Sequence, residues 1–197
     1  IGLERAGRTL IHAVLIARTE LAARAVASWW LANISVPRMT QGFNSRYDLL
    51  PAGTGGTPPS ALVYLAEGAG HLFARSDWGK DAMWMSFVAG PYNESHAHQE
   101  QGGFTLFARD WLAVTENIWS HSGINQGTDV HNLVRFVRNG TVARQCESTT
   151  RASTLTVTPG SGGAFTAAAN LTPAFCDNTA VTSWQRNFSF AARKLTV

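Results

Sequence analysis

The segment 90–113 contains two histidines, His96 and His98, separated by a single residue, with Glu100 two residues further on. Side chains at alternate positions of a strand point to the same face, so the three would lie together if the segment is extended. Imidazole and carboxylate groups ligate metals and transfer protons. The pattern therefore predicts a metal site or a site of proton transfer. The alternative is that these side chains only fill a polar corner of a β-sheet and have no chemical role.

Further titratable groups follow within 35 residues, and they favour the functional interpretation of the histidine pair. They are Glu116, His121, Asp129 and His131. Two glycines, Gly102 and Gly103, come directly after the histidine segment. Glycines leave space for another chain or a ligand beside a strand.

One metal motif can be tested on its spacing. Cupin oxidoreductases and isomerases place a glycine five residues before a His-x-His pair and a glutamate three or four residues after it. Gly90, His96 and His98 fit the first part. The glutamate should stand at position 102 or 103, and both are glycine, so a cupin-like metal enzyme ranks behind the other interpretations.

The composition of the 197 residues is that of a folded domain with ample material for a core. The chain is 45% hydrophobic and 15% charged, with a formal net charge of +3. Its basic residues are scattered, which argues against a nucleic-acid surface but is compatible with an acidic polymer. No run approaches the roughly 20 apolar residues that a membrane helix needs. We therefore expect no nucleic-acid partner and no membrane partner.

The chain divides into a helical segment over 1–36, a linker loop over 37–59 and an antiparallel β-sandwich over 60–197. Apolar residues at three- and four-residue spacing predict a helix over 3–31. Short β-rich runs separated by turn residues follow. The fold class is therefore predicted to be mainly β. The predicted strands lie within 61–66, 71–76, 82–90, 102–110, 111–117, 131–137, 153–158, 164–170 and 182–192.

A larger pattern resembles the β-domain of the heparinase II/III-like polysaccharide lyases, a group similar to some alginate lyases and uronyl epimerases. That family has H-x-H-x-D-x-G-x-F, then an apolar strand with WLA, then a His-Asn pair. Here the pieces read HAHQEQGGF at 96–104, WLA at 111–113 and HN at 131–132, with RSDW at 75–78 and RNF at 186–188. The similarity spans roughly residues 48–197. The preceding helix resembles the last one of the family's α/α toroid.

The resemblance implies a lyase that cleaves a uronate-containing acidic polysaccharide by β-elimination. It implies that His96 faces the substrate and is catalytic, while His98 and His131 bind a structural divalent metal, often zinc. No organic cofactor is expected. Further residues are expected to contact the substrate. They are Arg75, Glu100, Trp119 and His121.

Two departures from the family pattern concern the metal and the acidic residue. Glu100 stands where the motif has aspartate, and Thr115 stands where the third metal ligand is expected. Glu116 is adjacent and can replace that ligand only if a bulge shifts the register. The family's catalytic tyrosine belongs to the toroid. Tyr92 lies near the motif but is interpreted as a packing aromatic, so this chain is predicted to be catalytically incomplete without the toroid domain or a companion chain, and truncated at its C-terminal end.

The remaining expectations concern the cysteines, the tryptophans and a second functional class. Cys146 and Cys176 pair if the protein is secreted or periplasmic, which is the predicted location, and stay as thiols in a reducing compartment. Most tryptophans are expected in the core rather than in a sugar-stacking platform. The alternative to the lyase is a non-catalytic carbohydrate-binding β-sandwich.

Overall fold

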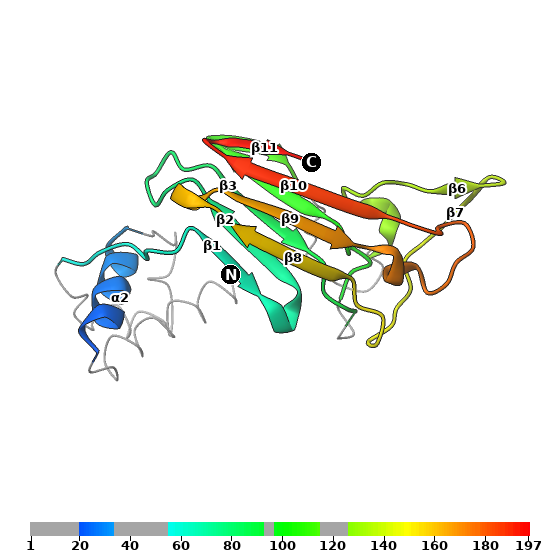
Figure 1. The fold of residues 1–197 in the computed structure, drawn as a ribbon, viewed down its shortest axis with the longest axis horizontal. Coiled ribbons are helices and arrows are strands. Elements are labelled where there is room, and N and C mark those ends of the chain that lie inside the picture. Colours follow the sequence, from blue (N-terminus) through cyan, green and yellow to red (C-terminus); the bar gives the residue numbers. More distant parts are fainter. Residues whose placement is uncertain (1–19, 34–54, 93–96, 115–125) are drawn as a thin grey trace, which may run out of the picture. The chain divides into compact units, whose positions relative to one another are not determined.

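The computed structural model describes residues 20–33, 55–92, 97–114 and 126–197. The chain forms two compact units, residues 1–60 and residues 61–197. The first contains the helix α2, and the second contains all the strands of the described residues (Figure 1). The assignment of the first unit to a toroid stays a prediction.

Helix α2 spans Leu21–Asn33. It begins where the carbonyl of Glu20 accepts the N–H of Arg24 at 3.1 Å. At the other end, the side-chain amide of Asn33 donates to the carbonyl of Trp29 at 2.8 Å, which satisfies one of the carbonyls left unpaired in a last helical turn. A single helix over 3–31 was predicted, and this is wrong at Glu20, which lies outside the helix; residues 1–19 lie outside the described part. None of the described helices is long and apolar enough to cross a membrane.

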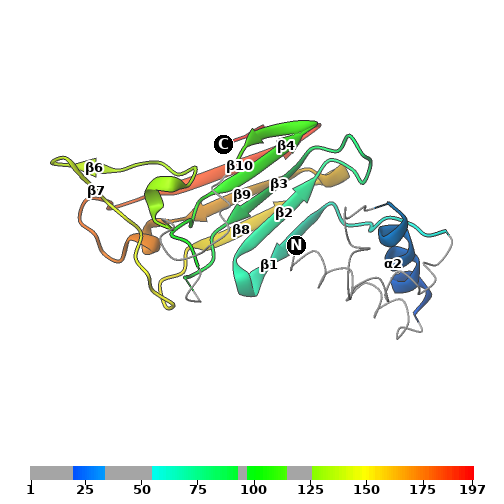
Figure 2. The same ribbon diagram turned by 180° about the vertical axis from the view of Figure 1, so that it is seen from behind.

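The second unit consists of antiparallel sheets, as predicted. A five-stranded sheet has the order β1-β2-β3-β4-β5, and a four-stranded sheet has the order β11-β10-β9-β8. Figures 1 and 2 show the two sheets stacked face to face, with the β6–β7 hairpin at one end. The strands of the first sheet are β1 Val63–Ala66, β2 His71–Arg75, β3 Trp84–Val88, β4 Phe104–Ala108 and β5 Asp110–Ala113. The others are β6 Val137–Arg138, β7 Thr141–Val142, β8 Thr154–Pro159, β9 Phe165–Asn170, β10 Gln185–Ala191 and β11 Lys194–Thr196.

The core lies between the two sheets, because each sheet buries one face of its alternating strands. Phe87 of β3 meets Phe188 of β10 with ring centroids 4.5 Å apart. Leu72 and Met85 on one sheet and Phe190 on the other are also almost fully buried. Each such side chain contributes roughly 1.5–3 kcal/mol through its removal from water. This packing fixes the sheet on which the candidate site lies.

The histidine segment is not extended, and one predicted strand does not form. The described residues 97–103 are loop and turn, so the histidine motif precedes β4 instead of lying in a strand. The stretch 131–137 is also irregular up to β6. Its residue Asn132 pairs with the backbone of Phe104 through its side chain, accepting the N–H at 3.1 Å and donating to the carbonyl at 2.6 Å. A side-chain amide thus occupies the place of a backbone partner.

Candidate functional site

The histidine segment ends in a tight turn that joins it to β4. The N–H of Gly103 donates to the carbonyl of Glu100 at 2.8 Å, and Gly102 has φ +99°, a conformation that favours glycine. A side chain at Gly102 would also collide, because its Cβ would lie 2.7 Å from Leu171 and 2.8 Å from Trp184. The two glycines therefore fit the crowded backbone just before β4.

An arginine of the opposite sheet holds the same turn. The guanidinium of Arg186, on β10, donates to the carbonyl of Gly102. It also lies 5.3 Å from the ring centroid of Phe104 and 5.9 Å from that of Trp184, within the range of cation–π attraction. Burial lowers the pKa of Arg186. This side chain, part of the RNF run of the sequence pattern, therefore positions the turn from inside the sandwich.

Glutamine side chains fix the residues on either side of Glu100. Gln145 accepts the N–H of Gln101 at 2.9 Å and donates to its carbonyl at 2.6 Å. The side chain of Gln101 in turn accepts the N–H of Ser153 at 2.8 Å. Gln99 accepts the N–H of Thr128 at 3.2 Å. Buried polar networks satisfied in this way hold a unique geometry.

Three of the predicted site residues meet at this place. Nδ1 of His98 lies 3.1 Å from Nε2 of His131, and Nδ1 of His131 lies 4.0 Å from Oε2 of Glu100. On its other side, Nε2 of His98 lies 3.4 Å from the amide nitrogen of Gln126. The His98–Glu100 segment and His131 are separated by more than 30 positions in the sequence, and the fold makes them one cluster. We call these three residues, His98, Glu100 and His131, the histidine cluster.

His131 is neutral in this cluster. Its side chain is fully buried, and burial together with the charge of His98 lowers its pKa to about 4. A hydrogen bond with the backbone of Gln126 and the charge of Asp129 act in the opposite direction. The contact of His131 with Glu100 is therefore no ion pair near neutral pH. Instead, a neutral imidazole presents a nitrogen to His98, where it can share a proton or ligate a metal.

Glu100 also occupies an unfavourable place for a charge. Burial raises its pKa, while the charges of His98 and His71 lower it. His71, at the start of β2, is the member of this neighbourhood that the sequence analysis missed. Its partner in the sheet is Val88, which bonds with Gly102 and Gly103, so β3 brings His71 toward the turn that follows Glu100.

Replacing Glu100 with glutamine is expected to increase the free energy of unfolding at pH 7, because the amide keeps the shape and removes a charge that burial disfavours. The sign follows from linkage: a raised pKa means that the folded state binds the extra proton above pH 4.5, so the cost of ionisation grows as pH rises. Urea unfolding at pH 7 and pH 4 measures the gain, which should shrink at the lower pH. The exposed Glu147→Gln is the control, and a loss of stability at pH 7 would contradict the prediction.

The spacing of the two histidine nitrogens is close to that of two ligands of one divalent metal. Two nitrogens bound to one tetrahedral zinc ion at ~2.0–2.1 Å lie about 3.3 Å apart, close to the 3.1 Å between the ring nitrogens of His98 and His131. Within the described part of the chain, no group of three or more His, Cys, Asp or Glu side chains converges on one point. Glu116 and Thr115 lie outside the described residues. The described donors therefore provide two adjacent ligands of a metal site and no third.

The other predicted site residues lie elsewhere or outside the description. Arg75 ends β2, four residues or about 13 Å along the strand from His71. Its Nε donates to the carbonyl of Asp77 at 2.6 Å, and its guanidinium lies 3.9 Å from the ring centroid of Trp78. Tyr92 is half-buried, and burial followed by the charge of Glu147 raises its pKa. The predicted residues His96, Glu116, Trp119 and His121 lie outside the described residues.

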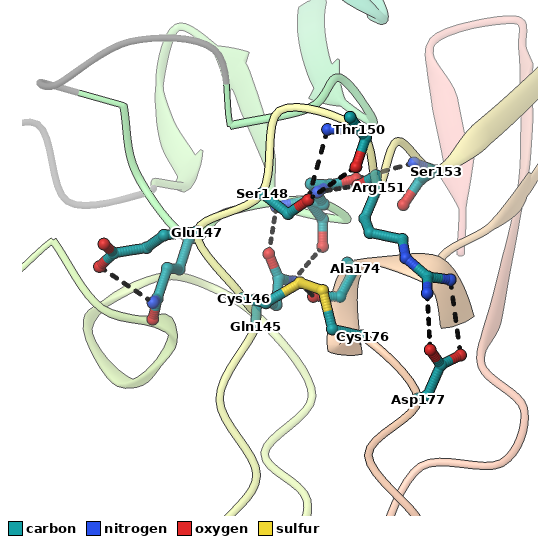
Figure 3. Close-up of a disulfide and its surroundings, with 12 residues drawn as sticks. Gln145, Cys146, Glu147, Ser148, Thr150, Arg151, Ser153, Ala174, Cys176 and Asp177 are labelled. Atoms are coloured by element: carbon teal, nitrogen blue, oxygen red, sulfur yellow. Dashed lines mark hydrogen bonds and ion pairs between the residues drawn. A yellow bond between two sulfur atoms is a disulfide. The ribbon is translucent and has the colours of Figure 1, made fainter.

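Cys146 and Cys176 form a disulfide, which settles the alternative left open by the sequence. Their Cα atoms are 5.9 Å apart (Figure 3). Gln145, which fixes Gln101, is the residue before Cys146. The exposed ion pair of Arg151 with Asp177, at 2.6 Å, lies beside the bond (Figure 3). The disulfide therefore anchors the irregular segment around Gln145, which supports the histidine cluster through Gln101.

The fold is that of a heparinase-type β-sandwich, as the sequence pattern predicted. Heparinase III, the BT4657 gene product, superimposes with a TM-score of 0.54 and 20% identity, over 72% of this chain and 22% of that one. A form of the same protein with methylated lysines gives the same values. Heparan sulfate lyase HepC from Pedobacter heparinus has a TM-score of 0.46 and 20% identity, over 89% of this chain and 26% of that one. The chain thus spans about a quarter or less of the length of these lyases. No family model and no curated protein sequence matches it.

Proposed function

We propose that the chain is the β-domain portion of a polysaccharide lyase that cleaves a uronate-containing acidic polysaccharide by β-elimination. One observation carries the proposal: the His98–Glu100 segment and His131, predicted to cooperate from widely separated parts of the sequence pattern, meet with ring nitrogens 3.1 Å apart. The likeness of the fold to heparinase III supports the same conclusion.

The chemistry needs three groups around one sugar ring. A base removes the C5 proton beside the uronate carboxyl group, a neutralising group stabilises the resulting carbanion, and an acid protonates the leaving oxygen at C4. We assign to His96 a direct role in proton transfer at the substrate. His98 and His131 are then structural, because His98 turns a ring nitrogen toward His131 and the latter is fully buried.

We expect His98 and His131 to hold a divalent metal, with Glu116 as the third ligand. When bound, the ion would fix the orientation of the loop that carries the histidines. Glu100 faces the far nitrogen of His131, the position from which a carboxylate orients a ligating imidazole. This arrangement assigns Glu100 a positioning role beside the substrate, and none of the proton transfers passes through the metal.

The catalytic unit is proposed to be completed by a toroid domain or a companion chain. The chain covers only 22% of heparinase III, and its described tyrosines, Tyr64 and Tyr92, lie outside the histidine cluster. The disulfide supports a secreted or periplasmic location, because such bonds persist in oxidising compartments.

The decisive experiment mixes the complete protein with hyaluronan, heparan sulfate, chondroitin sulfate and alginate, and follows ultraviolet absorbance. Only elimination creates the conjugated double bond that absorbs there, so binding alone gives no signal. His96→Ala is expected to abolish turnover, whereas Lys80→Ala, at a fully solvated site, should leave it unchanged. Absence of a signal with every polymer would refute the lyase, and full activity of His96→Ala would refute the role of His96.

The second candidate is a non-catalytic carbohydrate-binding β-sandwich. The observation that favours it is the number of aromatic side chains exposed on the five-stranded sheet. Binding of the polymers without any increase in absorbance would support this candidate.

A further inference from the structure

The five-stranded sheet carries aromatic side chains on the face turned away from the core. Tyr64 is 64% exposed, Phe73 is 46% exposed and Trp111 is 50% exposed. Trp84 and Phe107 are half-buried on the same face. Most tryptophans were expected in the core, but Trp111 is exposed and Trp84 turns away from the core. We call these five residues the aromatic face.

The pairing of the strands arranges the aromatic face in two rows across the sheet. In one row Tyr64 pairs with Phe73. In the other, Trp84 pairs with Phe107, whose ring stacks on it at 5.6 Å, and Phe107 pairs with Trp111. Strands lie about 4.8 Å apart and alternate residues of a strand about 6.6 Å apart, so the two rows lie side by side across the sheet. The surface is long enough to contact several sugar rings of a chain.

The strands of this face carry more basic than acidic side chains, although the carboxylate of Asp77 lies near Arg75. Strands β1 to β4 contain no Asp or Glu, while β2 turns His71 and Arg75 outward on either side of Phe73. Arg109, in the turn before β5, is also exposed. The only acid in the five strands is Asp110, at the sheet's edge, and its Oδ1 accepts the N–H of Trp111 at 2.8 Å. The face therefore complements an anionic partner.

We propose that the aromatic face, together with His71 and Arg75, binds a chain of the anionic glycan. The class of ligand rests on the proposed function. Aromatic rings contact the apolar C–H faces of pyranose rings, and guanidinium and imidazole groups pair with uronate or sulfate groups. His71 lies at the end of the face next to Glu100, so the surface continues from the histidine cluster and guides the same polymer toward it.

An apolar protein surface fits this face less well. Ser86 and Thr105 lie in the row of Tyr64 and Phe73, with their hydroxyl oxygens 2.5 Å apart. These two hydroxyl groups bond with each other, but a dry interface would bury the guanidinium of Arg75, whose terminal amino groups form no hydrogen bond within the described residues. Burying such groups without compensation is costly. A hydrated glycan, with hydroxyl and carboxylate groups between its apolar faces, satisfies them.

The test measures binding of hyaluronan, heparan sulfate and alginate to the complete protein carrying His96→Ala, so that cleavage does not interfere. Tryptophan fluorescence and calorimetry give the dissociation constants, and neutral dextran is the control polymer. We expect Trp111→Ala and Tyr64→Ala each to weaken binding of at least one uronate polymer about tenfold, and Arg75→Gln to weaken it with a smaller salt dependence. Trp111→Phe, which keeps a ring, should restore most of the affinity. Val137→Ala, an exposed apolar residue of the β6–β7 hairpin, should change nothing.

The outcomes separate this inference from the proposed function. A protein that binds the polymers through the aromatic face but produces no unsaturated uronate supports the inference and refutes the lyase. An active lyase whose affinity is unchanged by Trp111→Ala and Tyr64→Ala refutes the inference alone. If these variants change the sedimentation coefficient rather than glycan affinity, the face is an interface between copies of the chain, and the inference is also overturned.

Discussion

Removing the disulfide is expected to lower the free energy of unfolding by about 3.5 kcal/mol, because the bond closes a loop of about 30 residues in the unfolded chain. The double variant Cys146→Ser, Cys176→Ser should therefore unfold at a clearly lower urea concentration than the oxidised protein. Reduced wild type should behave like the double variant. Both transitions can be followed by tryptophan fluorescence, with a thiol assay confirming the redox state.

The neighbouring ion pair provides the matched control. Arg151→Ala removes the contact of Arg151 with Asp177 beside the disulfide, but both side chains are solvent-exposed, and such pairs contribute about 0–1 kcal/mol. Its unfolding midpoint should stay close to that of wild type. Equal midpoints for oxidised and reduced wild type would contradict the prediction.

The effect of the disulfide should extend to the histidine cluster. Cys146 follows Gln145, whose side chain bonds twice with the backbone of Gln101, and Gln101 follows Glu100. Loss of the bond therefore frees the segment that supports this network. A covalent link, a buried amide pair and a glycine turn act together on one loop, which explains how an irregular segment holds His98 and Glu100 against His131.

Much of the sandwich could be predicted because its strands alternate buried and exposed residues. The sequence of β9 follows this rule without exception, as Phe165, Ala167 and Ala169 are buried and the residues between them are exposed. The rule failed at 131–137, where an apolar run suggested a strand. There the side chain of Asn132 pairs with Phe104 in place of a backbone partner, a contact that no periodicity reveals.

The part of the candidate site that belongs to the sequence motif could be predicted. The spacing of His98, Glu100 and His131 matched a known pattern, and these residues meet. His71 was missed because its nearness to Glu100 depends on the pairing of β2 with β3 and on two glycines beyond them. The exposure of Trp111 was missed for a similar reason. In a short edge strand, the alternation of side chains between the two faces does not tell which face is buried.

The stability of the protein is expected to fall on acidification because of His131. Its pKa is about 4 in the folded protein and 6.5 in an unfolded chain, so between these values the unfolded state binds more protons. Stability therefore rises with pH through this window, is complete above pH 6.5 and is lost as pH falls toward 4. The contribution of this one group is roughly 3 kcal/mol.

His131→Gln isolates the contribution, because glutamine keeps polar atoms in the site and does not titrate. Urea unfolding with a chelator present, at several pH values between 4 and 7.5, should show wild type losing roughly 3 kcal/mol more than the variant. Asn132→Ala is the control: it removes the two bonds to Phe104 and should lower stability equally at every pH. The carboxylates that titrate in this range are common to all three proteins, so they cancel in the comparison. Parallel curves for wild type and His131→Gln would mean that the imidazole is not held neutral by its burial, and the structural role assigned to His131 would fall with it.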